Sequence, residues 1–257
     1  MIDRWMNQRG RRNDALQPDP DYTPQQAITS ISVLPPRGRE PNGQLQVMFS
    51  PWHHNRQYYN YEAYRQVAMG TTVLTIVSHP QVLEPDAKRV LQSYDYLSER
   101  AANEIGRRRG NFDTVRLFAA SSGNIALSRV ASLQPEWFHG ATMLAAGDNV
   151  ASCIWFGSRT ADLRSALTSE GYDFNRLNEL WAPLASSNHV AAFRDKPVTF
   201  VRSVYDANVP PHSQLAYCLE LREAGAQLDE RVSHLGHYLT IARALRCGVG
   251  GTAEHSI

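Results

Sequence analysis

Short apolar runs alternate with longer mixed segments along most of the chain. The runs at 72–77, 115–119 and 198–201 are apolar nearly throughout, which is typical of strands that helices cover on both faces. The full set of predicted strands lies at 28–34, 45–49, 72–77, 115–119, 141–145, 198–201 and 228–232. The pattern therefore predicts an α/β protein with a mostly parallel central sheet.

The segments between these runs predict the helices. We expect helices at 86–109, 124–132, 213–224 and 238–246. The first ends in three arginines before Gly110, and cations stabilise a helix C-terminus. Gly225 follows the third, as glycine commonly does after a helix. The arginines are therefore expected to serve the helix rather than a phosphate site.

The segment 152–188 breaks this alternation, because it is long and lies between two predicted strands. It contains Trp155, Phe156, Phe174, Leu177 and Trp181. We predict a helical insertion here. Its aromatic side chains serve either simple packing or a lid that shapes an apolar substrate pocket, and the sequence does not separate these alternatives.

The remaining chain predicts one main domain, at 28–247, between two loose ends. Residues 1–27 are rich in Arg, Asn, Gln and Pro, and residues 248–257 are rich in Gly and polar groups. We therefore expect a disordered N-terminal segment and a flexible C-terminal tail. With 257 residues, the chain is long enough to bury an apolar core without metals or disulfides.

Charge and cysteine content narrow the partners and the compartment. The formal net charge is +1 at pH 7, which implies no strong attraction to nucleic acid. The three cysteines have neither a metal-ligand spacing nor a disulfide pattern, which favours a reducing compartment. No apolar run is long enough for a membrane span, and the polar N-terminus lacks the apolar core of a secretory signal. We therefore expect a soluble, cytoplasmic protein.

The chain runs from an apolar strand straight into a helix, with Ser121 at the turn. Ala119 lies two residues before it and Gly123 two residues after it. Small residues are needed there because a sharp turn brings backbone against backbone. A serine at the apex of such a turn is a candidate nucleophile. If that serine were Ser122, Asn124 would stand where a small residue is required, so the pattern favours Ser121. The non-catalytic alternative is a serine that caps an ordinary βα turn.

This turn resembles the nucleophile elbow of the α/β-hydrolase family, which has the form small-x-Ser-x-small. It departs only at Ala119, where glycine is more frequent. In that family the orienting acid follows a late strand in a pattern similar to Asp-x-x-Val-Pro, which Asp206, Val209 and Pro210 match. Asp148 competes for this role, since some members carry the acid one strand earlier. A structural alternative is that Asp206 only braces its turn.

The resemblance further implies that His237 is the base, because it follows a glycine beyond the last strand. One ring nitrogen must reach the serine and the other the aspartate, which a loop at a strand end allows. His234 is the alternative, but it lacks the preceding glycine, and we expect it to flank the site. The order Ser121, Asp206, His237 is the order of nucleophile, acid and base in the family.

The resemblance covers about residues 45–246 and implies the arrangement of the whole domain. It implies a central sheet with helices on both faces and a helical cap insertion between strands 6 and 7. It also implies an oxyanion hole, whose first donor is the backbone N–H of Ser122.

In the family, the second oxyanion donor comes from the loop after an early strand, often within a His-Gly sequence, which residues 49–55 replace in this chain. Pro51 has no N–H, so we expect the N–H of Trp52 to be this donor. His53 and His54 follow it. Adjacent histidines on an extended loop point apart, and no carboxylate or cysteine cluster accompanies them, so a polar pocket wall is favoured over a metal site.

Together these motifs predict a serine hydrolase that cleaves a carboxylic ester of a small molecule through an acyl-enzyme, without cofactor or metal. Thioester cleavage, peptide or amide cleavage and acyl transfer use the same residues and remain alternatives. Two further alternatives are a ligand-binding protein without catalysis and a lyase that uses Ser121 and His237 for proton transfer. Oligomeric state and acyl chain length leave no trace in the sequence.

Overall fold

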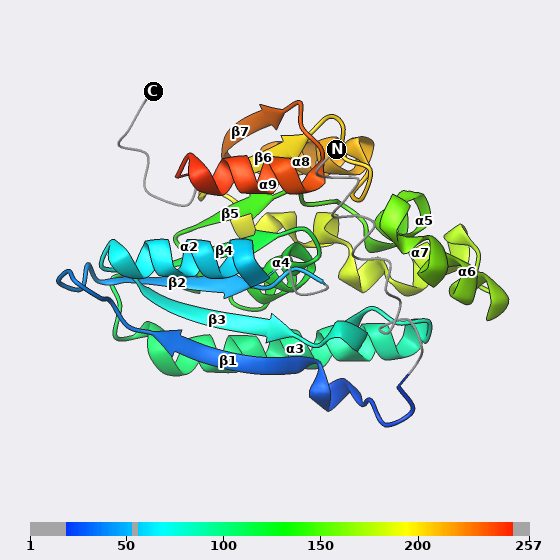
Figure 1. Cartoon of the computed structure of the whole chain (residues 1–257), viewed down its shortest axis with the longest axis horizontal. Coiled ribbons are helices and arrows are strands. Elements are labelled where there is room, and N and C mark those ends of the chain that lie inside the picture. Colours follow the sequence, from blue (N-terminus) through cyan, green and yellow to red (C-terminus); the bar gives the residue numbers. More distant parts are fainter. Residues whose placement is uncertain (1–18, 53–55, 249–257) are drawn as a thin grey trace.

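The computed structural model of the protein describes residues 19–52 and 56–248. Within these ranges, seven strands form one sheet in the order β1-β3-β2-β4-β5-β6-β7 (Figure 1). β1 (Ile28–Leu34) pairs antiparallel with β3 (Thr72–Ser78), and every other neighbouring pair is parallel. The remaining strands are β2 (Gln44–Phe49), β4 (Thr114–Ala120), β5 (Gly140–Leu144), β6 (Pro197–Ser203) and β7 (Gln227–Ser233). The predicted mostly parallel sheet is confirmed.

All seven predicted strands occur, and most of them extend slightly beyond the predicted run. β1 has the bounds of its predicted run, and the run at 141–145 ends at Leu144 because Ala145 turns the chain with a φ of +48°. Adjacent residues of one strand are buried on opposite faces: Val47 belongs to one apolar core and Met48 to the other. Burial on both faces explains why these runs carry so few polar residues.

Helices cover both faces of the sheet. α2 (Arg56–Ala68) and α9 (His237–Arg246) pack on one face, whereas α3 (Ala87–Arg109), α4 (Gly123–Leu133) and α8 (Pro211–Glu223) pack on the other (Figure 1). α3, α4, α8 and α9 are the predicted helices, and each end lies within two residues of its predicted place. In the described ranges, no helix combines the length and the apolar character that crossing a membrane requires.

The sequence pattern does not predict α2. Its buried face holds Tyr59 and Val67 at helical spacing, but the same face also buries Glu62 and Gln66. The Glu62 carboxylate is satisfied locally, because Arg65 and Gln66 donate hydrogen bonds of 2.7–2.8 Å to it. These polar residues interrupt the apolar period from which a helix is recognised.

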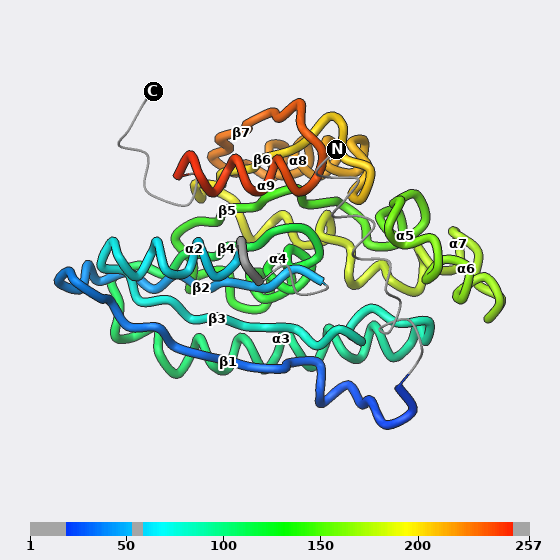
Figure 2. The backbone as a smooth tube through the Cα atoms, in the orientation of Figure 1, coloured from blue at the N-terminus to red at the C-terminus, as the bar shows by residue number. Residues whose placement is uncertain are grey.

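The segment between β5 and β6 is helical, as predicted. It contains α5 (Val150–Phe156), η4 (Ser158–Thr160), α6 (Ala161–Ser169), α7 (Phe174–Leu180), η5 (Ala182–Leu184) and η6 (Ser186–Phe193), where η marks a 3₁₀ helix. The expected place between strands 6 and 7 needs correction, because only the five strands β1 to β5 precede the segment in the described chain. The helices α5 to α7 lie beyond the carboxyl ends of β2 and β3 (Figure 2).

The aromatic side chains of this insertion pack against one another and against the domain. Trp181 is 1% exposed, and its indole N–H donates to Ala87 O at 2.8 Å, at the start of α3. The ring of Phe174 lies 6.3 Å from that of Trp155 and 5.4 Å from that of Phe156. For these residues the structure shows the packing alternative.

The predicted disordered segment, residues 1–27, extends too far toward the domain. Tyr22 is 3% exposed, its hydroxyl donates to Ser93 Oγ at 2.9 Å, and its ring stacks on His79. A buried aromatic ring ties down the residues around it, so residues 19–27 belong to the folded domain. Residues 1–18 and 249–257 lie outside the described residues.

The first turn of α4 lies directly against the end of β2. A Cβ atom built on Gly123 would stand 2.7 Å from Phe49 O and 2.9 Å from Ser50 O. Both contacts are to backbone, which cannot yield as the tip of a side chain can. This close approach therefore requires glycine at the position where the sequence pattern calls for a small residue.

We expect Gly123→Ala to lower the free energy of unfolding by about 1–3 kcal/mol, the usual cost of overpacking. Gly110→Ala is the matched control, because a Cβ there meets nothing within 4 Å and φ is −64°. It should be neutral or stabilise by about 0.4–1 kcal/mol. Urea unfolding followed by circular dichroism measures both variants. Equal stabilities would show that the contact between α4 and β2 is unimportant.

Candidate active site

Ser121 lies at the turn between β4 and α4 with a φ of +54°. A left-handed backbone costs a non-glycine residue roughly 1–3 kcal/mol, so surrounding contacts must hold it. The Ser121 N–H donates to Leu144 O at 2.8 Å, and Asn124 Nδ2 donates to Ser121 O at 2.9 Å. The turn is thus held by β5 on one side and by α4 on the other.

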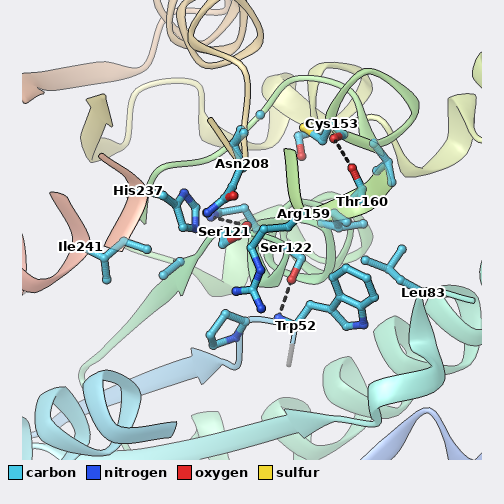
Figure 3. Close-up of a pocket in the computed structure, with 18 of the residues that line it drawn as sticks. Trp52, Leu83, Ser121, Ser122, Cys153, Arg159, Thr160, Asn208, His237 and Ile241 are labelled. Atoms are coloured by element: carbon cyan, nitrogen blue, oxygen red, sulfur yellow. Dashed lines mark hydrogen bonds between the residues drawn. The ribbon is translucent and has the colours of Figure 1, made fainter. Parts of the chain in front are cut away.

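Ser121 borders a cavity of about 110 Å³ (Figure 3). Residues that follow four neighbouring parallel strands line it, including Ser121, Gly147, Val209 and His237. Much of the remaining wall is apolar and comes from Leu83, Phe118, Ile125, Val150, Ile154 and Ile241. A cavity at the carboxyl ends of parallel strands is the usual ligand site of open α/β sheets.

The structure brings His237 and Asp206 together in a buried hydrogen bond. His237 is the first residue of α9, just after β7, and Asp206 follows β6. His237 Nδ1 lies 2.6 Å from Asp206 Oδ2, and both residues are at most 5% exposed. The His237 ring also packs edge-to-face on Tyr238. The contact fixes the orientation of the imidazole, and the ring lies at the cavity wall (Figure 3).

The two oxygens of Asp206 have different partners. Oδ1 accepts the N–H of Asn208 at 2.8 Å and the N–H of Val209 at 2.9 Å. Oδ2 contacts His237 Nδ1 and accepts Gln214 Nε2 at 2.9 Å. One oxygen therefore braces the turn, and the other contacts the histidine ring.

Gln214 is a supporting residue that the sequence pattern does not identify. Its side chain is fully buried in the first turn of α8. Nε2 donates to Asp206 Oδ2 and to Val209 O, and Oε1 accepts the N–H of Ser203 at 2.9 Å. The amide thereby links the end of β6 to the Asp206 loop. Its position shortly after Pro210 and Pro211 is the one signal in the sequence that could have pointed to it.

The competing residues lie in other surroundings. Asp148 Oδ1 accepts the hydroxyl of Ser213, and burial raises the pKa of this carboxyl above its ordinary value. His234 is exposed, with its ring centroid 6.1 Å from that of Tyr205. Within the described part of the chain, His237 has its carboxylate contact with Asp206 and none with Asp148.

The proposed oxyanion donors are linked to each other in a way the sequence does not predict. The Trp52 N–H, expected to face an oxyanion, donates instead to Ser122 Oγ at 2.6 Å. Its indole N–H donates to Pro80 O at 2.8 Å. The Ser122 N–H lies at the N-cap of α4, where backbone N–H groups have no acceptor inside the helix. Ser122 thus stands at the N-terminus of α4, and the Trp52 N–H is bonded to its side chain.

Ser121 and His237 border the same cavity, but in the described residues no hydrogen bond joins Ser121 Oγ to His237 Nε2. Such bonds are often long before substrate binds. His53 and His54, expected as polar pocket wall, lie outside the described residues. Among the residues the structure describes, no group of three or more His, Cys, Asp or Glu side chains could hold a metal ion.

The insertion contributes to the cavity through residues that the sequence pattern does not single out. Cys153 and Ile154 of α5 and Arg159 and Thr160 of η4 line the cavity. Figure 3 shows the side chain of Arg159 close to Ser121 and Ser122. None of the five aromatic or leucine residues named in the sequence belongs to the described lining. The insertion therefore packs through its aromatic side chains and shapes the cavity through its smaller and charged ones.

Several solved structures resemble this fold. An acylaminoacyl peptidase from Pyrococcus horikoshii aligns with a TM-score of 0.62 and 11% identity, over 84% of this chain and 36% of the peptidase. A puromycin-hydrolyzing peptidase from Mycobacterium tuberculosis gives 0.57 and 15%, over 90% and 40%. A cold-adapted esterase from an Arctic intertidal metagenomic library gives 0.55 and 13%, over 85% and 84%.

This chain thus spans little more than a third of the two peptidases but most of the esterase. No family model matches the sequence, and no curated protein is a significant match. The likeness is one of fold, and it shows that the chain has the α/β-hydrolase fold, as the motifs predict.

Cysteine reactivity tests the surroundings of the cavity. Burial raises the pKa of the Cys153 thiol to about 12 and that of the Cys218 thiol to about 11, whereas Cys247 is exposed. A raised pKa keeps a thiol protonated and unreactive at pH 8. Iodoacetamide should therefore alkylate Cys247 alone in the native protein and all three cysteines after unfolding, as intact mass shows. Cys247→Ser should remove the native adduct, and rapid native alkylation of Cys153 would contradict the raised pKa of its thiol.

Proposed function

We propose that this protein is a serine hydrolase that cleaves a carboxylic ester through an acyl-enzyme intermediate. Ser121 is the nucleophile, His237 the general base and Asp206 the acid that orients the base. The observation that carries the proposal is the buried 2.6 Å contact between His237 Nδ1 and Asp206 Oδ2, beside the cavity that Ser121 borders. The fold shared with peptidases and an esterase agrees with it.

The first half of the reaction acylates Ser121. His237 Nε2 removes the hydroxyl proton as Ser121 Oγ attacks the ester carbonyl, and the Asp206 carboxylate stabilises the resulting imidazolium. Because Asp206 accepts hydrogen bonds from Asn208, Val209 and Gln214 as well, it cannot turn away when the ring becomes charged. The imidazolium then gives its proton to the departing alcohol oxygen.

The tetrahedral oxyanion is stabilised by two backbone N–H groups, one at the start of α4 and one in the loop after β2. The Ser122 N–H is the first donor, since it follows the nucleophile at a helix N-terminus. The Trp52 N–H is the second and must share its hydrogen with Ser122 Oγ or exchange it for the oxyanion. Such a donor contributes roughly 3–4 kcal/mol to catalysis.

The second half of the reaction releases the acid. Water enters the position that the alcohol has left, His237 removes a proton from it, and the hydroxide attacks the acyl carbonyl. The oxyanion forms in the same place, and Ser121 leaves with the proton from His237. No step requires a group that this chain does not supply.

An ester demands less of this site than an amide, because an alkoxide leaves more easily than the anion of an amine. Thioester cleavage, amide or peptide cleavage and acyl transfer are the alternatives on the same three residues. A ligand-binding protein or a lyase would not form a covalent acyl-enzyme, so trapping that species separates both from the proposal.

Replacing the nucleophile is expected to abolish both covalent labelling and turnover. Wild type should gain one adduct from a fluorophosphonate probe by intact mass, and Ser121→Ala none, with hydrolysis of 4-nitrophenyl butyrate reduced at least about 10⁴-fold. Ser122→Ala is the matched control and should still be labelled, because its hydroxyl only accepts the Trp52 N–H. Labelling that survives in Ser121→Ala and is lost in Ser122→Ala would move the nucleophile to Ser122.

Two aspartates can be compared in the same assay. Asp206→Asn is expected to lower kcat by roughly 10³–10⁴-fold, because an amide no longer holds the correct histidine tautomer. Its NH₂ group would also face one of the four donors that now surround the carboxylate. Asp148→Asn should lower kcat less than about tenfold, since Asp148 is bonded to Ser213 instead. A larger effect of Asp148→Asn would assign the acid to Asp148.

A further inference from the structure

Arg159 enters the same cavity from the insertion. It is the central residue of η4, and its side chain points into the cavity (Figure 3). Its guanidinium lies 5.5 Å from the ring centroid of Tyr238, a second lining residue. Among the described residues, no oxygen accepts a hydrogen bond from this guanidinium. The planar guanidinium, which has five N–H donors, thus faces the cavity without a hydrogen-bond acceptor among the described residues.

The position of Arg159 is tied to the loop of the proposed acid. The Ser158 N–H donates to Ala207 O at 2.7 Å, and the Ser158 hydroxyl donates to Asn208 Oδ1 at 3.1 Å. On the other side, the Thr160 hydroxyl donates to Ile154 O at 2.7 Å. These bonds hold η4 directly beside the Asp206 loop, so the guanidinium has a defined place relative to the site.

The charge of Arg159 is not compensated at the cavity. None of the described lining residues is acidic, and Arg159 is the one Lys or Arg among them. The Asp148 carboxylate accepts a hydrogen bond from Ser213, and the Asp206 carboxylate contacts His237. Burial lowers the pKa of Arg159 below its ordinary value, although an arginine remains charged at neutral pH. A bound anion would supply the missing partner.

Other arginines of the insertion differ in this respect. Arg164 donates to Trp155 O, and Arg176 donates to Gly171 O while its guanidinium stacks on Tyr172 at 4.8 Å. Neither belongs to the described lining of the cavity. Both therefore serve the insertion itself, whereas Arg159 presents its donors to whatever occupies the cavity.

We propose that Arg159 binds a carboxylate of the substrate, so that the protein favours esters whose acyl part carries a second, free carboxylate. The guanidinium fork matches a carboxylate with two parallel hydrogen bonds. A phosphate, with a charge near −2, would leave about one charge without a partner in a largely apolar wall. The assignment rests on the proposed ester hydrolysis at Ser121 and adds the substrate class to it.

The test uses ethyl half-esters of succinic, glutaric and adipic acid, each paired with the ethyl ester of the straight-chain monocarboxylic acid of equal length. A pH-stat follows proton release. The measured quantity is the ratio of kcat/KM for the charged ester to that for its neutral partner. Three chain lengths are used because the spacing between the ester and the free carboxylate must match the distance between Ser121 and Arg159. The assay compares the wild type with Arg159→Gln, Arg159→Lys, Arg176→Gln and Ser121→Ala.

In wild type the ratio should exceed about tenfold at one chain length or more, as a charge-assisted hydrogen bond implies. Arg159→Gln should reduce that ratio by about tenfold or more, and Arg159→Lys should retain part of it, because a lysine keeps the charge but not the fork. Arg176→Gln is the matched control, an exposed arginine stacked on tyrosine, and its ratio should equal that of wild type.

Two failures can be told apart. The assignment of Arg159 is overturned if the wild type shows no preference for the charged ester at any chain length, either because it hydrolyses both esters equally or because it hydrolyses neither. It is also overturned if the preference survives in Arg159→Gln. Thermal unfolding of Arg159→Gln checks that a lost preference is not a lost fold. Hydrolysis by Ser121→Ala at the wild-type rate overturns the proposed function instead, whatever Arg159 does.

Discussion

The left-handed turn at Ser121 is the constraint on which the rest of the site depends. A φ of +54° reverses the chain between β4 and α4, and it is tolerated because the Ser121 N–H binds Leu144 O on the neighbouring strand. The same turn presses Gly123 against Phe49 O, so α4 starts directly behind β2. The contacts of this turn therefore hold three parallel strands, β2, β4 and β5, in fixed positions relative to one serine.

Asp206 is the second fixed point, and it acts in two directions. Through Oδ1 it closes its own loop on Asn208 and Val209, and through Oδ2 it meets His237 and Gln214. A buried carboxylate with four partners has little freedom to move, since each lost hydrogen bond would leave a buried donor unsatisfied. The Asp206 loop therefore sets the orientation of the His237 ring. Gln214 in turn links this loop to β6.

The insertion is hydrogen-bonded to the Asp206 loop. Ser158 binds Ala207 and Asn208, and a Cβ on Gly157 would stand 2.5 Å from Asn208 O. The two hydrogen bonds and this close approach hold η4 against the Asp206 loop. The hydrogen bond from Trp181 also attaches the insertion to the start of α3. The insertion residues that line the cavity therefore belong to a segment that is packed against the domain.

The sequence by itself determined the strands, the βα turn and the order of the three candidate residues, because these follow from local sterics and from the apolar period. It did not determine α2, where Glu62 and Gln66 occupy the buried face. Only the tertiary structure decided that His237 contacts Asp206 and not Asp148, and that Gln214 and Arg159 belong to the site. The physical reason is that these relations are hydrogen bonds and surfaces between segments far apart in the chain, which no local pattern encodes.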